Sequence, residues 1–145
     1  MSAKKFFSTE QQDSIIKAIE IAEHATSGEV RVHIDDACKG DVLDAATHVF
    51  HKLKMDKTDL RNGVLFYLAV NDKKFAILGD KGINEKVPEN FWDTIKETML
   101  SYFKQGQFTQ GLCKGIEMAG EKLKTHFPYQ SEDRNELSDE ISFGK

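Results

Sequence analysis

The chain has 145 residues, of which 39% are hydrophobic and 30% are charged, and its formal net charge is −4. This length suits one domain with a real core better than two domains. The mild acidity provides no basic field for nucleic acid, and no run of about eighteen apolar residues predicts a membrane span. We therefore expect neither nucleic-acid binding nor membrane insertion.

The N-terminus and the cysteines indicate a cytoplasmic protein. Lys4 and Lys5 are not followed by the apolar segment of a signal peptide. Cys38 and Cys113 lie far apart in the sequence and form no C-x-x-C motif. We therefore expect two free thiols in a reducing compartment.

Apolar periodicity predicts a helix, a strand and a second helix in the first part of the chain. Ser8, with Gln11 three residues later, suits a capping box, and apolar residues then recur at helical spacing. Residues 29–34 alternate strictly between polar and apolar, which indicates a half-exposed strand. Asp41 is expected to cap the next helix, which extends to about Leu53.

A β-hairpin is predicted for residues 63–79. Residues 64–70 read Val-Leu-Phe-Tyr-Leu-Ala-Val, which is typical of a strand buried on both faces. Asn71 and Asp72 mark a two-residue turn, after which residues 73–79 return as a second strand.

Two further helices and a tail are expected after the hairpin. Pro88 suits the first turn of one helix, which ends at Gly106. The other helix begins near Thr109, and its three glycines would allow close packing against a neighbour. The acidic, polar composition of residues 128–145 predicts a mostly disordered tail, so the folded domain should span residues 6–127.

The order of these elements predicts an α/β fold with a mixed sheet. A strand-helix-strand crossover makes the first two strands parallel, and the hairpin makes the third strand antiparallel to the second. Because the middle strand is apolar on both sides, helices should cover both faces of the sheet. The starts of the first two strands and the end of the third then meet at one edge.

Polar residues gather at this edge. Five of them carry the hard oxygen donors that Ca²⁺ and Mg²⁺ prefer: Glu29, Asp59, Asn62, Asp80 and Asn84. Two cations, Arg61 and Lys81, would balance these acids or hold a phosphate oxygen. Three glycines would let the backbone approach a ligand: Gly63, Gly79 and Gly82. The same residue types are common in turns, so the pattern alone also allows a purely structural interpretation.

Three motifs, in their order and spacing, resemble the TPM domain family. They are Gly28-Glu29-Val30, Asn62-Gly63-Val64-Leu65 and Gly79-Asp80-Lys81-Gly82. A fourth, Gln107-Phe108-Thr109-Gln110-Gly111-Leu112, is similar to the family's aromatic-x-x-Gly-Leu and extends the resemblance over about residues 6–127. The resemblance implies a three-layer α/β/α sandwich with a divalent-cation site at the edge described above.

The family includes a plant thylakoid-lumen acid phosphatase and a photosystem repair factor. Its extracytoplasmic members often carry a signal peptide and a membrane anchor. Neither feature is evident in this sequence. We therefore expect a stand-alone, cytoplasmic TPM domain.

Three functional hypotheses follow. The first is a TPM domain that binds Ca²⁺ or Mg²⁺ and acts through a protein partner as a binding or assembly module, because no nucleophile or tuned base accompanies the oxygen cluster. The second is a metal-dependent acid phosphatase acting on phosphate monoesters, with the cation held by Asp80, Glu29 and Asp59. The third is a folded module whose acidic tail recruits partners.

Other candidate sites have a structural explanation. Cys38 lacks the arginine six residues later that a cysteine phosphatase needs. The pair Asp35-Asp36 suits a turn or a helix N-terminus better than acid–base chemistry. We place His33 on the exposed polar face of its strand, and we interpret His48 and His51 as surface histidines, because no third metal ligand is evident near them.

Overall fold

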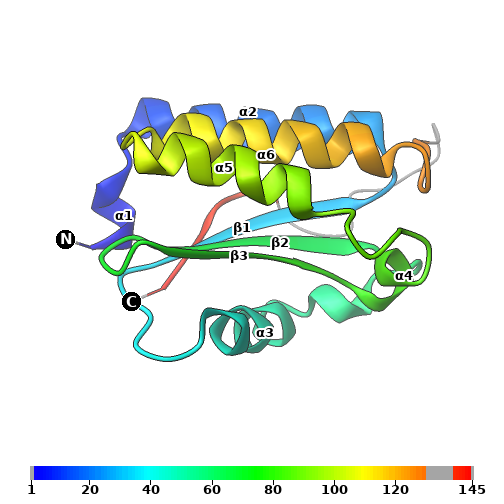
Figure 1. Ribbon diagram of the computed structural model, residues 1–145, viewed down its shortest axis with the longest axis horizontal. Helices are drawn as coiled ribbons and strands as arrows, with labels where there is room; N and C mark the ends of the chain where they lie inside the picture. Colours follow the sequence, from blue (N-terminus) through cyan, green and yellow to red (C-terminus); the bar gives the residue numbers. More distant parts are fainter. Residues whose placement is uncertain (1, 130–138, 145) are drawn as a thin grey trace.

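Within residues 2–129 and 139–144, which the computed structural model describes, a four-stranded sheet forms the middle layer (Figure 1). Its strands are β1 (Glu29–Asp35), β2 (Gly63–Ala69), β3 (Lys74–Gly79) and β4 (Ser142–Phe143), in the order β3-β2-β1-β4. Strand β1 is parallel to β2 and to β4, whereas β3 is antiparallel to β2. The predicted parallel crossover followed by a hairpin is confirmed.

Helices cover both faces of the sheet, as expected for a three-layer α/β/α sandwich (Figure 1). One face is covered by α2 (Thr9–Ala25), α5 (Asp93–Lys104) and α6 (Phe108–Leu123), and the other by α3 (Val42–Lys52). The shorter elements are α1 (Ala3–Phe6), the 3₁₀ turn η1 (Met55–Lys57) and α4 (Lys81–Asn84). In the described part of the chain, no helix combines the length and the apolar character needed to cross a membrane.

Strand β2 forms the centre of the core, and all of its residues are buried. Val64, Phe66 and Leu68 belong to the large apolar cluster with α2, α5 and α6. Leu65, Tyr67 and Ala69 belong to the smaller cluster with α3. Each large apolar side chain buried in this way contributes about 1.5–3 kcal/mol to folding. The two-sided burial predicted from the continuous apolar run is therefore confirmed.

Capping side chains set the helix starts as predicted. The Ser8 hydroxyl accepts a hydrogen bond of 3.1 Å from the backbone N–H of Gln11. The Gln11 side chain accepts one of 2.8 Å from the N–H of Ser8, which completes the capping box. Asp41 caps α3 by accepting a hydrogen bond of 2.9 Å from the N–H of Leu43.

Two boundaries differ from the prediction. The loop between β2 and β3 spans residues 70–73 rather than two residues, and Lys73 adopts a left-handed φ of 53°. Helix α5 begins at Asp93 rather than at Pro88. The backbone turns before that point, because the Pro88 carbonyl accepts a hydrogen bond from the N–H of Phe91.

The glycines of α6 allow the close packing that was expected. A Cβ on Gly115 would lie 2.4 Å from Sδ of Met99 on α5. A Cβ on Gly120 would lie 2.9 Å from Cβ of Ala22 on α2. Glycine lowers the helix propensity of α6 at these positions, but the missing side chains let α2 and α5 pack closely against it.

The C-terminal segment differs from the prediction of a disordered tail. Ser142 and Phe143 form β4, which pairs with His33 and Ile34 of β1. Ile141 and Phe143 pack against the large apolar cluster. The packing of these two apolar side chains holds the segment on the sheet, although the acidic composition of the segment predicted disorder. The remainder of the predicted tail, residues 130–138 and 145, lies outside the described residues.

His33 is buried rather than on the surface, with an exposed fraction of 6%. Because a carboxylate can only accept, His33 Nε2 donates to Asp35 at 2.7 Å. His33 Nδ1 lies 2.8 Å from the hydroxyl of Ser142, on the strand that covers this side of β1. The interpretation of His33 as a surface histidine is wrong, whereas His48 and His51 are exposed.

A protonated carboxyl joins the end of α2 to β1 and the tail. Glu23 Oε2 accepts a hydrogen bond of 3.0 Å from the N–H of Val30. Burial, a hydrogen bond with Asp139 and the charges of Asp139 and Glu29 raise the pKa of Glu23 from 4.5 to about 10, although the Val30 N–H opposes the shift. The folded protein therefore holds a proton here at neutral pH.

We predict that Glu23→Gln stabilises the protein at pH 7 by about 1–3 kcal/mol. A glutamine needs no proton, and its carbonyl can still accept from Val30. The folded-state pKa of Glu23 lies above its unfolded value, so its contribution is full below pH 4.5 and is lost as the pH rises toward 10.

Urea unfolding at pH 5 and pH 8 checks this expectation. The gain from Glu23→Gln should be larger at pH 8. Glu20→Gln, at an exposed position of the same helix, is the matched control and should change little. An equal gain at both pH values would contradict a buried proton at Glu23.

Candidate functional site

The three chain segments predicted to share one edge of the sheet are joined directly. Glu29 of β1 lies opposite Gly63 of β2, and Gly79 of β3 lies opposite Val64. The N–H of Glu29 donates to the Asn62 carbonyl at 3.1 Å, and the N–H of Asp80 donates to the Gly63 carbonyl at 2.9 Å. The topology therefore places residues 29, 62, 63 and 80 side by side.

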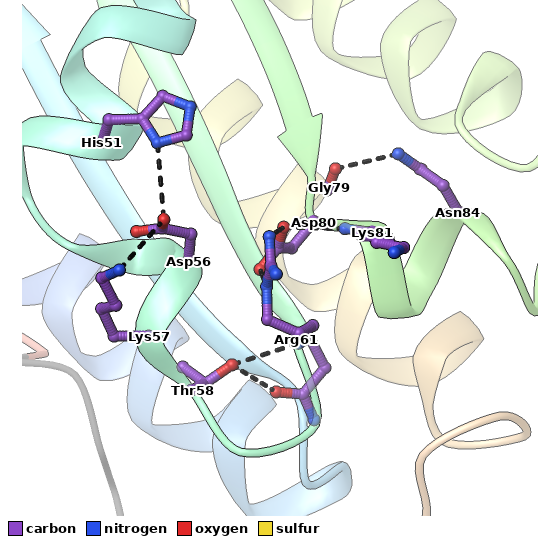
Figure 2. Close-up of polar contacts among 10 residues, drawn as sticks. His51, Asp56, Lys57, Thr58, Arg61, Gly79, Asp80, Lys81 and Asn84 are labelled. Carbon is purple, nitrogen blue, oxygen red and sulfur yellow. Dashed lines mark hydrogen bonds and ion pairs between the residues drawn. The ribbon is translucent and has the colours of Figure 1, made fainter.

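Asp80 is the charged centre of this edge (Figure 2). Its exposed fraction is 6%, and Arg61 holds it with a two-pronged ion pair. Arg61 Nε donates to Oδ2 at 2.8 Å and Nη2 donates to Oδ1 at 3.0 Å. This contact raises the pKa of Arg61, chiefly through the hydrogen bond.

Asp80 also begins α4. Its Oδ1 accepts a hydrogen bond of 2.7 Å from the N–H of Lys81, in the manner of an N-cap. Both carboxylate oxygens of Asp80 therefore already accept hydrogen bonds. A ligand cation at Asp80 must displace at least part of this arrangement.

Asn62 is buried inside the loop that leads into β2, with an exposed fraction of 2%. Its Nδ2 donates to the Ser27 carbonyl at 3.1 Å, and its Oδ1 lies 3.4 Å from the Thr58 hydroxyl. The Thr58 oxygen in turn accepts from the N–H of Asn62 at 3.2 Å. Asn62 thus connects the start of β1 to the start of β2.

Gly82 allows α4 to approach this loop closely. Its N–H donates to the Arg61 carbonyl at 2.8 Å. A Cβ on Gly82 would lie 2.1 Å from the carbonyl oxygen of Leu60 and 2.6 Å from that of Arg61. Arg61 itself adopts a left-handed φ of 49°, which turns its side chain back toward Asp80 (Figure 2).

The other predicted residues lie on the chain segments that meet at this edge. Asn84 Nδ2 donates to the Gly79 carbonyl at 3.1 Å, so Asn84 closes the first turn after β3. Asp59 and Lys81 are exposed at the surface. Glu29 is buried at the start of β1, with an exposed fraction of 5%, and its charge acts on Glu23.

Sequence reasoning missed Thr58 and Asp56. Thr58 orders the loop through Asn62, and its position four residues earlier is a pattern that local side-chain-to-backbone bonds favour. Asp56 contacts Nδ1 of His51 at 3.6 Å and Nζ of Lys57 at 3.7 Å (Figure 2). The charges of Asp56 and Arg61 also act on each other, so this neighbouring cluster is coupled electrostatically to the Asp80 pair.

The donor set limits what the edge can hold. Among residues 2–129 and 139–144, no three His, Cys, Asp or Glu side chains come together as a metal-binding group. A cation at Asp80 would therefore need amide oxygens, backbone carbonyls and water as further ligands. Mg²⁺ is commonly held by one or two carboxylates with several retained waters, whereas Ca²⁺ takes six to eight oxygens.

These features define a three-layer α/β/α domain with a polar site at one end of a mixed sheet. The chain belongs to the TPM domain family, whose model matches residues 1–122. No curated protein matches the sequence.

Solved structures of other proteins share the fold. The BA42 protein of the psychrophilic bacterium Bizionia argentinensis is 51% identical, with 97% of each chain covered and a TM-score of 0.92. The N-terminal domain of a protein from P. gingivalis is 14% identical, with 90% of this chain and 84% of that chain covered and a TM-score of 0.71.

The N-terminal domain of the cg2496 protein from Corynebacterium glutamicum is 13% identical, with 96% of this chain and 80% of that chain covered and a TM-score of 0.63. At this low identity, the last two structures support the fold alone.

We predict that Gly82→Ala destabilises the protein by about 2 kcal/mol or more, because its Cβ would meet two backbone oxygens that cannot easily move. Chemical denaturation monitored by circular dichroism measures the loss. Gly40→Ala is the matched control, because a Cβ there meets nothing within 4 Å. Equal effects of the two substitutions would show that α4 does not depend on this close approach.

Proposed function

We propose that this TPM domain binds a divalent cation at Asp80 and acts as a binding or assembly module. One observation carries the proposal. Asp80 is a nearly buried carboxylate, and its counter-charge comes from an Arg61 side chain that is 44% exposed.

The imbalance in burial makes the Arg61 contact exchangeable. A buried carboxylate needs a positive partner, because leaving it unpaired costs several kcal/mol. Arg61 loses much less by leaving, since nearly half of its side chain is already in water and hydration replaces the contact. A divalent cation would offer the same carboxylate a higher charge and would release Arg61 to solvent.

The proposed ligand set centres on Asp80, with the carboxylate of Asp59 and the amide oxygen of Asn84 as the further donors. Asn62 would hold the loop in place, and Glu29 would add negative charge from the start of β1. With so few carboxylates, water would complete the coordination, which favours Mg²⁺ over Ca²⁺.

A metal-dependent phosphatase is the second candidate, and two cations beside Asp80 favour it: Arg61 contacts its carboxylate, and Lys81 is the next residue in the chain. Once released from Asp80, Arg61 would be available to stabilise charge on a phosphoryl group. Hydrolysis of p-nitrophenyl phosphate, lost in Asp80→Asn, is the expected result for this candidate. Hydrolysis that survives the substitution would exclude Asp80 from the reaction.

The binding proposal is tested by amide NMR titration with Mg²⁺ and Ca²⁺. We predict saturable shifts confined to residues 59–63 and 79–84. Arg61→Gln should tighten binding by about tenfold, equivalent to about 1.4 kcal/mol, because it removes the internal competitor. The circular dichroism spectrum of this variant checks that the fold is retained.

Asp80→Asn is the matched control, because asparagine keeps the N-cap to Lys81 but loses the charge. We expect it to abolish the shifts. Shifts that persist in Asp80→Asn, or an affinity that Arg61→Gln weakens, would contradict a cation held by Asp80 in competition with Arg61.

A further inference from the structure

The outer edge of β1 carries a short strand from the end of the described chain. Ser142 and Phe143 pair in parallel with His33 and Ile34. The N–H of Gly144 donates to the Ile34 carbonyl at 2.9 Å. Because this ladder is short, it has few backbone hydrogen bonds. The specificity for one segment must therefore come from side-chain contacts.

Buried polar groups contact one side of the segment that contains β4. His33 joins the Ser142 hydroxyl at 2.8 Å on one ring nitrogen and Asp35 at 2.7 Å on the other. Asp35 is itself fixed by the Tyr67 hydroxyl, which donates to it at 2.6 Å. Burial and this hydrogen bond raise the pKa of Tyr67, so the phenol remains a donor. These contacts hold the His33 ring in an orientation in which Nδ1 faces the hydroxyl of residue 142.

The other side of the segment packs against the apolar core. Ile141 and Phe143 pack against the large apolar cluster, as alternate residues of a strand must. The intervening residues face the polar side. Continuing the register brings Glu140 toward Arg31, whose guanidinium it attracts. The buried Nε atom of Arg31 has no hydrogen-bond partner among residues 2–129 and 139–144.

The end of the segment admits only glycine. A Cβ on Gly144 would lie 1.7 Å from Oδ1 and 2.9 Å from Cγ of Asp35. Asp35 cannot easily turn away, because both of its oxygens are held by His33 and Tyr67. At the other end, the Asp139 carboxyl meets the carboxyl of Glu23 through a shared hydrogen bond.

We propose that the outer edge of β1 is a recognition site for an extended peptide, which the chain's own residues 139–144 fill in cis. The ligand it fits carries an acidic residue, an apolar residue, a hydroxyl residue, an aromatic residue and a glycine in succession. Its main-chain atoms extend the sheet, while alternate side chains enter the polar and the apolar sides. This site is separate from Asp80, and the proposal does not depend on cation binding.

Occupation in cis makes the site self-blocking. A tethered segment competes at an effective concentration on the order of millimolar, so a separate peptide of equal quality binds weakly until the tether is released. A partner segment that also satisfies Arg31 Nε would compete better than the chain's own tail.

The test uses the full chain carrying Gly144→Val, which should release the tail by collision with Asp35. Amide NMR should show shifts at residues 31–35 and faster hydrogen exchange at residues 141–144, with β2 and β3 unchanged. Adding the synthetic peptide Asp-Glu-Ile-Ser-Phe-Gly should return residues 31–35 to their wild-type shifts. The wild-type chain should bind the same peptide at least about tenfold more weakly, because its own tail competes.

The same peptide carrying Gly144→Val is the matched control and should not bind. Full-chain Ser142→Ala is a second, milder variant: it removes the hydroxyl contact to His33 and should bind the peptide with intermediate affinity. The proposal is overturned if the peptide leaves residues 31–35 of both variants unshifted. Equal affinity for the wild-type chain and the Gly144→Val chain would also overturn it, because the tail would then not occupy the site.

Discussion

The two-sided burial of β2 is the constraint on which the rest of the structure depends. A strand with no polar face cannot lie at the edge of a sheet or beneath a single layer, so β1 and β3 must flank it and helices must cover both faces. The parallel crossover and the hairpin follow from the order of the elements along the chain. Together they bring the entry of β1, the entry of β2 and the exit of β3 to one place, where the apolar strand ends and the backbone must find polar partners.

Two carboxylates in the described part of the molecule, the buried Asp80 and the partly buried Glu23, are neutralised by different means. Asp80 has the guanidinium of Arg61, whereas Glu23 keeps a proton against Asp139. The first solution responds to other cations and the second to pH. Each carboxylate also joins segments that are distant in sequence: Asp80 joins the β2 entry to α4, and Glu23 joins α2 to the end of the chain. At both places, the interaction that neutralises a carboxylate therefore also holds together segments that are distant in the sequence.

Much of the fold could be predicted from the sequence, because its strongest signals are local. The apolar run at residues 64–70, the Ser8 capping box and the Asp41 cap each depend on a few neighbouring residues. The convergence at Asp80 was also predictable, since it follows from strand directions. The pairing of Asp80 with Arg61 was not, because it depends on a left-handed backbone at Arg61 that no residue type there signals.

The burial of His33 and the strand β4 were missed for a related reason. Both depend on a contact between residues 109 positions apart, and the acidic composition of the tail outweighed the alternation of Ile141 and Phe143. Helix α4 was missed because Gly82 reads as a loop residue, whereas here it is required by the carbonyl of Leu60.

The direction of β4 determines at which end of the sheet an attached tether or domain would lie. Because β4 runs parallel to β1, Gly144 lies beside Ile34, and the amide of Ala3 reaches Asp36 just beyond the same strand. Both ends of the described chain therefore lie at one end of the sheet, and α4 lies at the opposite end (Figure 1). A tether, an anchor or a second domain joined at either terminus would leave the Asp80 edge facing outward, about 20 Å away along the strands. Fusions for immobilisation can therefore use either terminus without shielding that edge.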